Sequence, residues 1–241
     1  MSINTTYDKE ILQKILFSID NSFDIDQLLK QRTIFEDKFL KKLNLCNMNL
    51  DFLNKKLSKF SQISSIYLGK NNFTTIPKTL LNLTSLENLW INNNKIRYLP
   101  KGINKFTKLK ILVLNYNYLE SIPKEIGTLN EIEYLNLASN KLYSLPEEIG
   151  KLKGLRKLWL NNNNLSKLPE NFGNLQNLRV LDLKGNNLST LPQNLKHLRK
   201  LHYLAVNFGD LTLEMGNKFK ENSFDNQLIQ KFLYQLDAHG K

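Results

Sequence analysis

A single pattern repeats along most of this sequence. When residues 63–200 are written in lines of 23, the same arrangement of apolar residues occurs six times in register, with the skeleton LxxLxLxxNxLxxLPxxIxxLxx. A repeat period of about 20 to 30 residues is typical of a solenoid, in which each unit buries its apolar side only against its neighbours. The pattern therefore constrains the fold more than any other feature of the chain. The six lines begin at Ile63, Leu86, Leu109, Ile132, Leu155 and Leu178.

Each line predicts one strand and one turn. Its LxLxx segment alternates apolar and outward residues, as a half-buried strand does, and successive lines would pair as a parallel sheet with strands about 4.8 Å apart. The proline at the fifteenth position, such as Pro169, stops the strand from continuing. The apolar residues that follow, such as Ile149 and Leu152, have the spacing of a short helical or 3-10 turn. A narrow strand side and a wider turn side predict a right-handed α/β horseshoe with a concave sheet.

Asparagine occupies the ninth position of all six lines. A buried amide both donates and accepts hydrogen bonds, so this column can satisfy the backbone groups that are exposed where the chain turns off each strand. Loss of one such amide is expected to cost roughly 1–3 kcal/mol, because buried backbone groups lose their partner. The predicted ladder is Asn71, Asn94, Asn117, Asn140, Asn163 and Asn186.

The motif resembles the leucine-rich repeat of the LPxxI type, which is common in bacterial proteins. The resemblance covers well over half the chain and rests on six consecutive copies in register. It implies a horseshoe solenoid that works as a binding module. Secreted eukaryotic members of this family usually carry disulfide-bonded caps, whereas this chain has one cysteine, Cys46, and can form no internal disulfide.

Degenerate copies extend the solenoid in both directions. One period before Ile63, a line beginning at Leu40 fits the skeleton, with Met48 in place of the asparagine. After the sixth line, an incomplete copy begins at Leu201 and has Gly209 at the asparagine position. We therefore predict about eight repeats over residues 40–213, the first and last of them degenerate.

Helical caps are predicted at both ends of the solenoid. The segments 1–39 and 214–241 lie outside the repeats, and terminal units must cover the open ends of the core. Apolar residues at helical spacing predict helices over 8–20, 26–38 and 225–238. The alternative for the N-terminal helices is a detachable partner-binding or dimerising element.

The residues between the buried leucines of each strand are expected to face the concave side, where the fold requires no particular residue. The third, fifth and eighth positions nevertheless hold both tryptophans and several tyrosines, and exposed aromatic clusters mark interaction sites. The alternative is that these rings only pack against their neighbours on the sheet. If they bind a partner, Trp90→Ala or Trp159→Ala should cost about 2 kcal/mol of affinity or more and barely move the melting temperature. The predicted partner-binding residues are Tyr67, Trp90, Ile111, Val113, Tyr116, Tyr134, Lys157, Trp159, Val180 and Asp182.

The charge of the chain narrows the kind of partner. A net charge of +12 and a sequence pI near 9.6 are compatible with nucleic acid, an anionic membrane or an acidic protein. A phosphate-binding trough would need Lys and Arg along the concave columns, where Asn, aromatic and aliphatic residues outnumber them. The basic end near Arg156, Lys157 and Arg179 suits a protein with an acidic patch, so nucleic acid is not expected.

We predict no catalytic site, metal or cofactor. The three histidines lack metal-ligand spacing, and no histidine lies near Cys46 in the repeat order. No glycine-rich phosphate loop is present. The sequence thus predicts a non-enzymatic protein–protein interaction module. The alternatives are an electrostatic binder of nucleic acid or an anionic surface, and a secreted bacterial effector that binds a host protein.

The sequence predicts a cytoplasmic monomer. No stretch approaches the roughly 18 uninterrupted apolar residues of a membrane span. Charged residues at 8–10 precede the apolar residues 11–19, and Lys14 interrupts them, which does not fit a signal peptide. Export without a cleaved signal stays open as the alternative.

Overall fold

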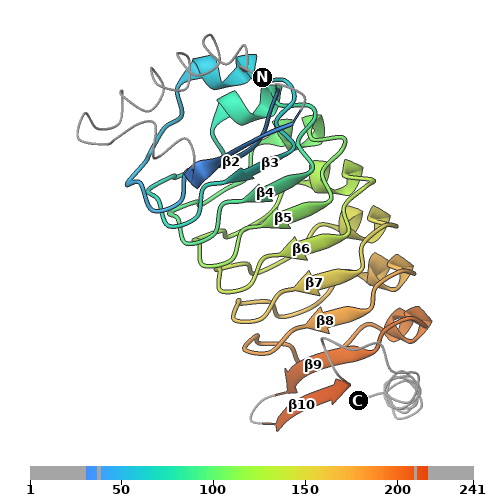
Figure 1. The fold of residues 1–241 in the computed structure, drawn as a ribbon. Helices are drawn as coiled ribbons and strands as arrows, with labels where there is room; N and C mark the ends of the chain where they lie inside the picture. Colours follow the sequence, from blue (N-terminus) through green and yellow to red (C-terminus); the bar gives the residue numbers. More distant parts are fainter. Residues whose placement is uncertain (1–30, 37–38, 209–210, 217–241) are drawn as a thin grey trace.

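The computed structural model describes residues 31–36, 39–208 and 211–216, which form a curved solenoid with a sheet along one side (Figure 1). The sheet has ten strands within these residues, and their order in space follows their order in the chain from β1 to β10. Strands β2 to β9 are parallel, and each pairs with the next at equivalent positions of the repeat. Their bounds are β2 (Phe39–Asn44), β3 (Ser65–Tyr67), β4 (Asn88–Trp90), β5 (Ile111–Val113), β6 (Tyr134–Asn136), β7 (Lys157–Trp159), β8 (Val180–Asp182) and β9 (Tyr203–Phe208).

The other side of the solenoid is made of short 3-10 helices, as the spacing of the apolar residues predicted. A proline stands immediately before six of them, and Asn54 stands before the first. Each turn closes through a backbone bond such as Leu152 N to Ile149 O, at 3.2 Å. The helices are η1 (Lys55–Lys59), η2 (Lys78–Asn82), η3 (Lys101–Lys105), η4 (Lys124–Thr128), η5 (Glu147–Lys151), η6 (Glu170–Asn174) and η7 (Gln193–His197).

One continuous hydrophobic core lies between the strands and the turns, running from Leu40 to Val206. The apolar positions of every repeat are almost fully buried in it, and the degenerate first copy contributes Met48, Leu50 and Leu57 in the same way. Each repeat therefore packs against the next through equivalent residues. This confirms the predicted leucine-rich horseshoe with a parallel sheet and 3-10 turns.

The N-terminal end of the sheet differs from the prediction. Strand β1 (Thr33–Glu36) pairs antiparallel with β2, where we predicted a helix over 26–38. That prediction is wrong for residues 33–36. The edge of a parallel sheet presents unpaired backbone groups, and a strand that folds back satisfies them directly. The helix predicted over 8–20 lies outside the described residues.

The C-terminal end is closed in the same manner. Strand β10 (Leu211–Gly216) pairs antiparallel with β9, so the sheet continues to Gly216, beyond the boundary predicted at residue 213. The helix predicted over 225–238 lies outside the described residues.

The asparagine column connects neighbouring repeats through backbone groups. Asn163 accepts a hydrogen bond from Leu142 N at 3.0 Å and donates to Leu137 O and Leu160 O at 3.0 and 2.9 Å. Asn71, Asn94, Asn117 and Asn140 bond in the same pattern and are buried. Asn186 makes the equivalent bonds to Leu165 N, Leu160 O and Leu183 O from a half-buried position.

The eighth position of the repeat is left-handed, which the sequence does not reveal. Lys70, Asn93, Tyr116, Ser139 and Asn162 all have φ between 53° and 57°. Glycine and asparagine adopt this conformation readily, whereas Lys, Tyr and Ser do so at a cost, so residue type gave no consistent sign of the turn. This residue lies in the turn that follows the strand, and its side chain is exposed in four of the five, whereas Ser139 is half-buried.

Three glycines let the turns of the middle repeats approach backbone to backbone. A Cβ added at Gly127, Gly150 or Gly173 would lie 2.5, 2.3 or 2.2 Å from a carbonyl oxygen of the following turn. Gly102 is different, because a Cβ there would meet only the end of the Leu81 side chain, at 2.9 Å. Close contact on the convex side limits how far the solenoid can bend there.

Gly173→Ala is therefore expected to lower the free energy of unfolding by about 2 kcal/mol, because two backbone segments must separate to admit the methyl group. Gly102→Ala is the matched control and should change stability by about 0.5 kcal/mol or less, since the Leu81 side chain can turn away. Urea unfolding followed by circular dichroism measures both variants. Equal losses in the two would contradict the close backbone packing of η6 and η7.

Candidate partner-binding face

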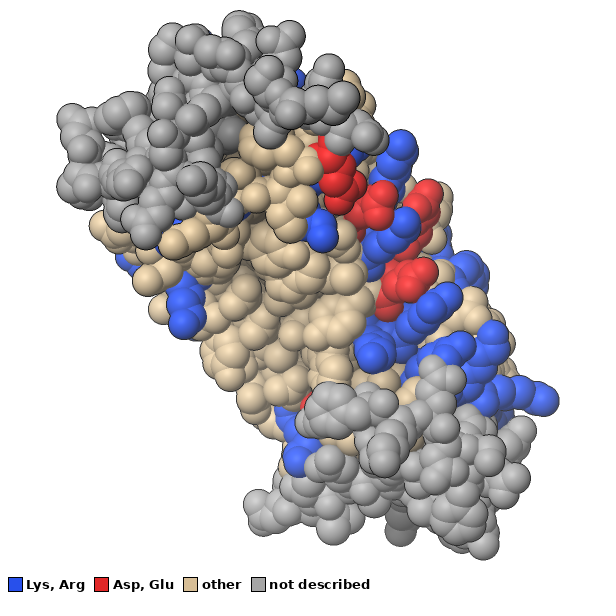
Figure 2. Space-filling model, viewed as in Figure 1, with Lys and Arg blue, Asp and Glu red and all other residues tan. Residues whose placement is uncertain are grey.

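The concave face consists of the third and fifth positions of each repeat, which the parallel register places side by side. Tyr67 pairs with Trp90, Ile111 with Tyr134, and Asn136 with Trp159. Figure 2 shows uncharged side chains over the middle strands, with most of the charged ones along one edge. The fold thus presents a strip of aromatic, aliphatic and amide groups on a rigid sheet.

An aromatic pair lies at the N-terminal end of this strip. The rings of Tyr67 on β3 and Trp90 on β4 are stacked, with centroids 4.6 Å apart and planes at 14°. Both residues are half-buried, so each ring has one face covered and part of its surface open. Such stacking holds a large apolar surface in a fixed orientation at the concave face.

A second aromatic pair lies further along the sheet. Tyr134 on β6 and Trp159 on β7 have centroids 6.3 Å apart and planes tilted by 50°. Burial raises the pKa of the Tyr134 hydroxyl, and its hydrogen bonds with Asn136 and Trp159 offset part of that rise. The phenol therefore stays protonated at neutral pH.

Trp159 also contributes to a small cluster at the C-terminal end of the face. It packs against Val180, Tyr203 and Ala205, all three of which are buried. Its side chain therefore supports the fold as well as facing the concave side. Trp90 lies outside this cluster.

Trp159→Ala is expected to lower the free energy of unfolding by about 1–2 kcal/mol, below the cost for a fully buried tryptophan because its side chain is half-buried. This replaces the expectation that the substitution barely moves the melting temperature. Trp90→Ala serves as the comparison. It should lower the free energy of unfolding by less, because it breaks one stacked aromatic pair and removes no contact with the buried cluster. Thermal unfolding of both variants checks the difference, and a larger loss for Trp90→Ala would contradict it.

The remaining predicted site residues fall into three groups. Val113, Val180 and Asp182 are buried, with Val180 at 0% exposure. Ile111 and Lys157 are half-buried on the sheet face. Tyr116, 58% exposed, lies at the left-handed turn beyond β5, away from the paired strand residues.

Polar residues at the fifth position cap the ends of the strands. Asp182 Oδ1 accepts a hydrogen bond from Lys184 N at 3.2 Å, and Asn136 Oδ1 accepts one from Ala138 N at 3.1 Å. Asn44 holds Cys46 N in the same way, at 3.0 Å. Short side chains of Asn and Asp favour this local bond two residues ahead. Asp182 therefore has a structural role that the concave-column argument did not anticipate.

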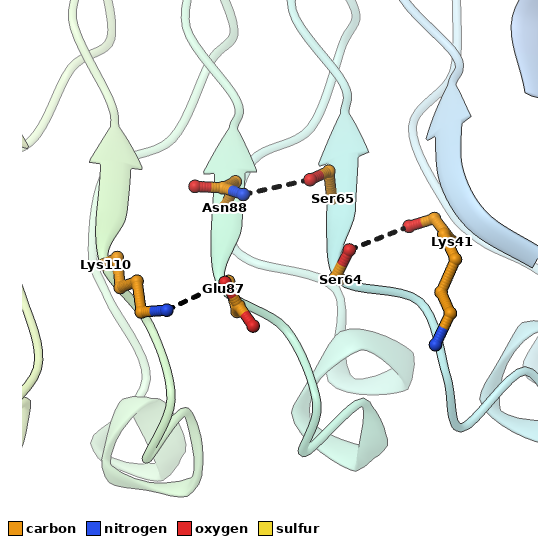
Figure 3. A network of polar contacts seen from close by, with 6 residues as sticks. All are labelled: Lys41, Ser64, Ser65, Glu87, Asn88 and Lys110. Carbon is orange, nitrogen blue, oxygen red and sulfur yellow. Dashed lines mark hydrogen bonds and ion pairs between the residues drawn. The ribbon is translucent and has the colours of Figure 1, made fainter. Parts of the chain in front are cut away.

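A ladder of polar contacts borders the face where the strands begin (Figure 3). Lys110 Nζ lies 3.0 Å from Glu87 Oε2, and Asn88 Nδ2 donates to Ser65 Oγ at 3.0 Å. The hydrogen bond and charge of Glu87 raise the pKa of Lys110. These contacts join equivalent positions of consecutive repeats. At the second position the charge alternates from Glu87 to Arg156, and Arg179 ends the alternation.

Sequence reasoning missed a group of exposed tyrosines on the turns after the strands. Tyr98, Tyr118 and Tyr143 are all exposed, and Lys141 Nζ lies 5.1 Å from the centre of the Tyr118 ring. They occupy the thirteenth, tenth and twelfth positions, where most repeats carry small polar, Asn or Lys residues. The change to tyrosine at these positions could have indicated an exposed aromatic surface. It was missed because the concave face was assigned only to the third, fifth and eighth positions.

Reactive groups are sparse in the part of the chain that the structure describes. Burial raises the pKa of the Cys46 thiol, although a backbone bond from Gly69 and the charges of Arg32 and Lys70 act in the opposite direction. Cys46 thus has little thiolate at neutral pH. Within the same residues, no three His, Cys, Asp or Glu side chains gather to hold a metal ion, and no helix has the length and apolarity to cross a membrane.

Several solved structures of leucine-rich-repeat proteins are similar to this chain. A leucine-rich-repeat protein of Leptospira interrogans is 32% identical, with a TM-score of 0.66, over 70% of this chain and 42% of that one. The PEPR1–AtPEP1 structure is 26% identical, with a TM-score of 0.72, over 84% and 31% of the two chains. The plant peptide hormone receptor RGFR1 in complex with RGF2 is 27% identical, with a TM-score of 0.59, over 65% and 27%.

This chain spans less than half the length of each of these proteins. No curated protein matches it. The family description "leucine-rich repeat region" matches residues 27–165 and 145–218, which together are most of the chain. With its 23-residue period, its amide column and its parallel concave sheet, the chain belongs to the leucine-rich-repeat family.

Proposed function

We propose that this protein is a non-enzymatic binding module that holds a partner protein on its concave face. The observation that carries the proposal is the stacked pair of Tyr67 and Trp90, which offers a partly open aromatic surface on a rigid sheet. Tryptophan and tyrosine dominate the energetics of protein interfaces because they bury a large area with few rotatable bonds. Ile111, Tyr134, Lys157 and Trp159 extend the proposed contact surface along the sheet.

The spacing of the two aromatic pairs suggests how a partner would be held. Trp90 on β4 and Trp159 on β7 are three strands apart, and strands lie about 4.8 Å from one another, which gives a separation of about 14 Å. Ile111, between them on β5, is half-buried and adds an aliphatic contact. A partner with two apolar anchors at this separation would engage both pairs.

Two similar structures support a protein or peptide partner. RGFR1, a plant peptide hormone receptor, is in complex with RGF2, and PEPR1 is paired with AtPEP1. The uncharged concave strip also favours a protein over nucleic acid, since a phosphate chain would find few cations on the sheet face (Figure 2).

Capture from native lysate, with and without nuclease, tests the proposal. The wild-type chain should retain a protein partner after nuclease treatment, and Trp90→Ala should lose it. Tyr143→Ala is the matched control, because it removes an exposed aromatic side chain from a turn outside the concave face. Capture that disappears with nuclease would favour an electrostatic nucleic-acid binder, and capture that survives Trp90→Ala would refute the concave site.

A further inference from the structure

A polar hollow of about 390 Å³ opens on the edge of the solenoid where strands β6, β7 and β8 begin. Its charged walls carry four basic and two acidic side chains, so their summed charge is positive. In Figure 2 the charged edge shows acidic and basic side chains mixed toward the N-terminal strands and mainly basic ones further on. The charged walls are Lys110, Glu131, Glu133, Arg156, Arg179 and Lys200.

A glycine creates the space. Gly154 stands at the last position of its repeat, where the adjacent repeats carry Glu131 and Asn177 and the next one carries Lys200. All four residues line the hollow, and only Gly154 contributes no side chain to it. Because Gly154 has no side chain, the hollow stays open between the charged side chains that line it.

Neighbouring side chains hold two of the cations in place. Arg156 Nη1 lies 3.3 Å from Glu133 Oε2, and Lys200 Nζ donates to Asn177 Oδ1 at 2.6 Å. Asn177 is in turn anchored by its bond to Lys153 O, at 2.8 Å. The Arg156–Glu133 pair is about half exposed, and surface pairs of this kind are weak enough to admit another carboxylate.

We propose that this hollow binds an acidic segment of a partner protein, with one carboxylate held by Arg156, Arg179 and Lys200. Guanidinium groups match the planar geometry of a carboxylate, and the cations lie around a space that a side chain can enter. Because Glu131 and Glu133 line the same hollow, they disfavour a continuous run of phosphates more than a single carboxylate that contacts only the basic side chains. The inference does not depend on the concave face being a binding site.

Fluorescence anisotropy with a labelled oligo-glutamate peptide tests the site in the full chain. The peptide should bind, and added salt should weaken it. Arg156→Gln and Lys200→Gln should each lower the affinity about fivefold, the effect of losing one exposed ionic contact. Lys124→Gln removes the same charge from an exposed residue of η4 and should leave the affinity unchanged.

A second variant separates shape from charge. Gly154→Asn fills the hollow without altering the net charge, and the repeat accommodates asparagine at the equivalent residue 177. It should lower peptide affinity as much as Arg156→Gln, with a melting curve recorded to show that the chain is folded. The new Cβ would lie 3.2 Å from Asn130 O and Ile132 O. If this contact unfolds the chain, the test of the proposal rests on the Arg156 and Lys200 variants, whose side chains are exposed.

Five results would overturn the proposal: no peptide binding, an equal loss in Lys124→Gln, full affinity in both Arg156→Gln and Lys200→Gln, tighter binding of a single-stranded oligonucleotide than of the peptide, or an equal loss in Trp90→Ala. Trp90→Ala should leave peptide affinity unchanged, and an equal loss there would place the peptide on the concave face instead. The Trp90 variant and the Arg156 and Lys200 variants together distinguish failure of the proposed concave site from failure of the proposed hollow site.

Discussion

Replacing Asn163 by alanine is expected to lower the free energy of unfolding by about 3 kcal/mol, the upper part of the range for an unsatisfied buried group. The amide serves three buried backbone groups at once: Leu142 N, Leu137 O and Leu160 O. Alanine leaves Leu142 N without its acceptor, in a position where the asparagine itself is only 5% exposed. It also removes one of two amide bonds at each carbonyl, since Leu137 O still accepts from Asn140 and Leu160 O from Asn186. Urea unfolding followed by circular dichroism measures the change.

The adjacent residue provides the control. Asn164 is exposed at the next position, so Asn164→Ala makes the same chemical change in solvent and should shift stability by about 0.5 kcal/mol or less. Asn163→Asp keeps the shape and the acceptor but removes the two N–H donors to Leu137 O and Leu160 O. It should be at least as damaging as alanine, because it also buries a charge. An Asn163→Ala protein as stable as Asn164→Ala would show that the ladder does not support the solenoid.

The position of Asn163 adds a second expected signature. Its bonds to Leu137 and Leu142 cross to the preceding repeat, so the substitution weakens the interface between two units. Solenoid stability is approximately a sum of unit and nearest-neighbour terms, and a weakened interface near the middle divides the array. Unfolding of Asn163→Ala should therefore be broader than that of the wild type, with a smaller denaturant slope.

Strict repetition explains why the architecture could be predicted. From β3 to β8, every strand begins at the third position and ends at the fifth, because the same apolar residues recur every 23 residues. The ends could not be predicted in this way. Strands β1 and β10 have no equivalent in the repeat, and they form because the outer strands offer unpaired backbone groups.

The sequence predicted which side of the sheet the candidate site residues face, but not how exposed their side chains are. The register places Val180 on the concave side, as expected, yet Trp159 and Tyr203 are large enough to bury it from the two neighbouring strands. Whether a residue on this face is buried depends on the size of the side chains in the adjacent repeats. A list of the residues at one repeat position does not take those sizes into account. Asp182 is buried for a different reason, since its carboxylate accepts a hydrogen bond from the backbone of Lys184 two residues later.

Trp90→Ala is expected to weaken partner binding by about 2 kcal/mol or more, about thirtyfold in the dissociation constant. The ring stacks on Tyr67 on the N-terminal side, and the residue paired with Trp90 on the other side is the smaller Val113. A partner side chain can therefore pack against the open part of the ring surface. Isothermal titration of the captured partner against both proteins measures the loss.

Tyr67→Ala provides the complementary variant. If the stack matters because it fixes the orientation of Trp90, removing Tyr67 should also weaken binding, and the double variant should lose less than the sum of the two single losses. Tyr143→Ala, an aromatic deletion of equal size on an exposed turn, should bind as the wild type does. Additive losses at Tyr67 and Trp90 would mean that the two rings contact the partner independently. An unchanged affinity in Trp90→Ala would move the interface away from the concave face, toward the edge that carries Arg156 and Lys200.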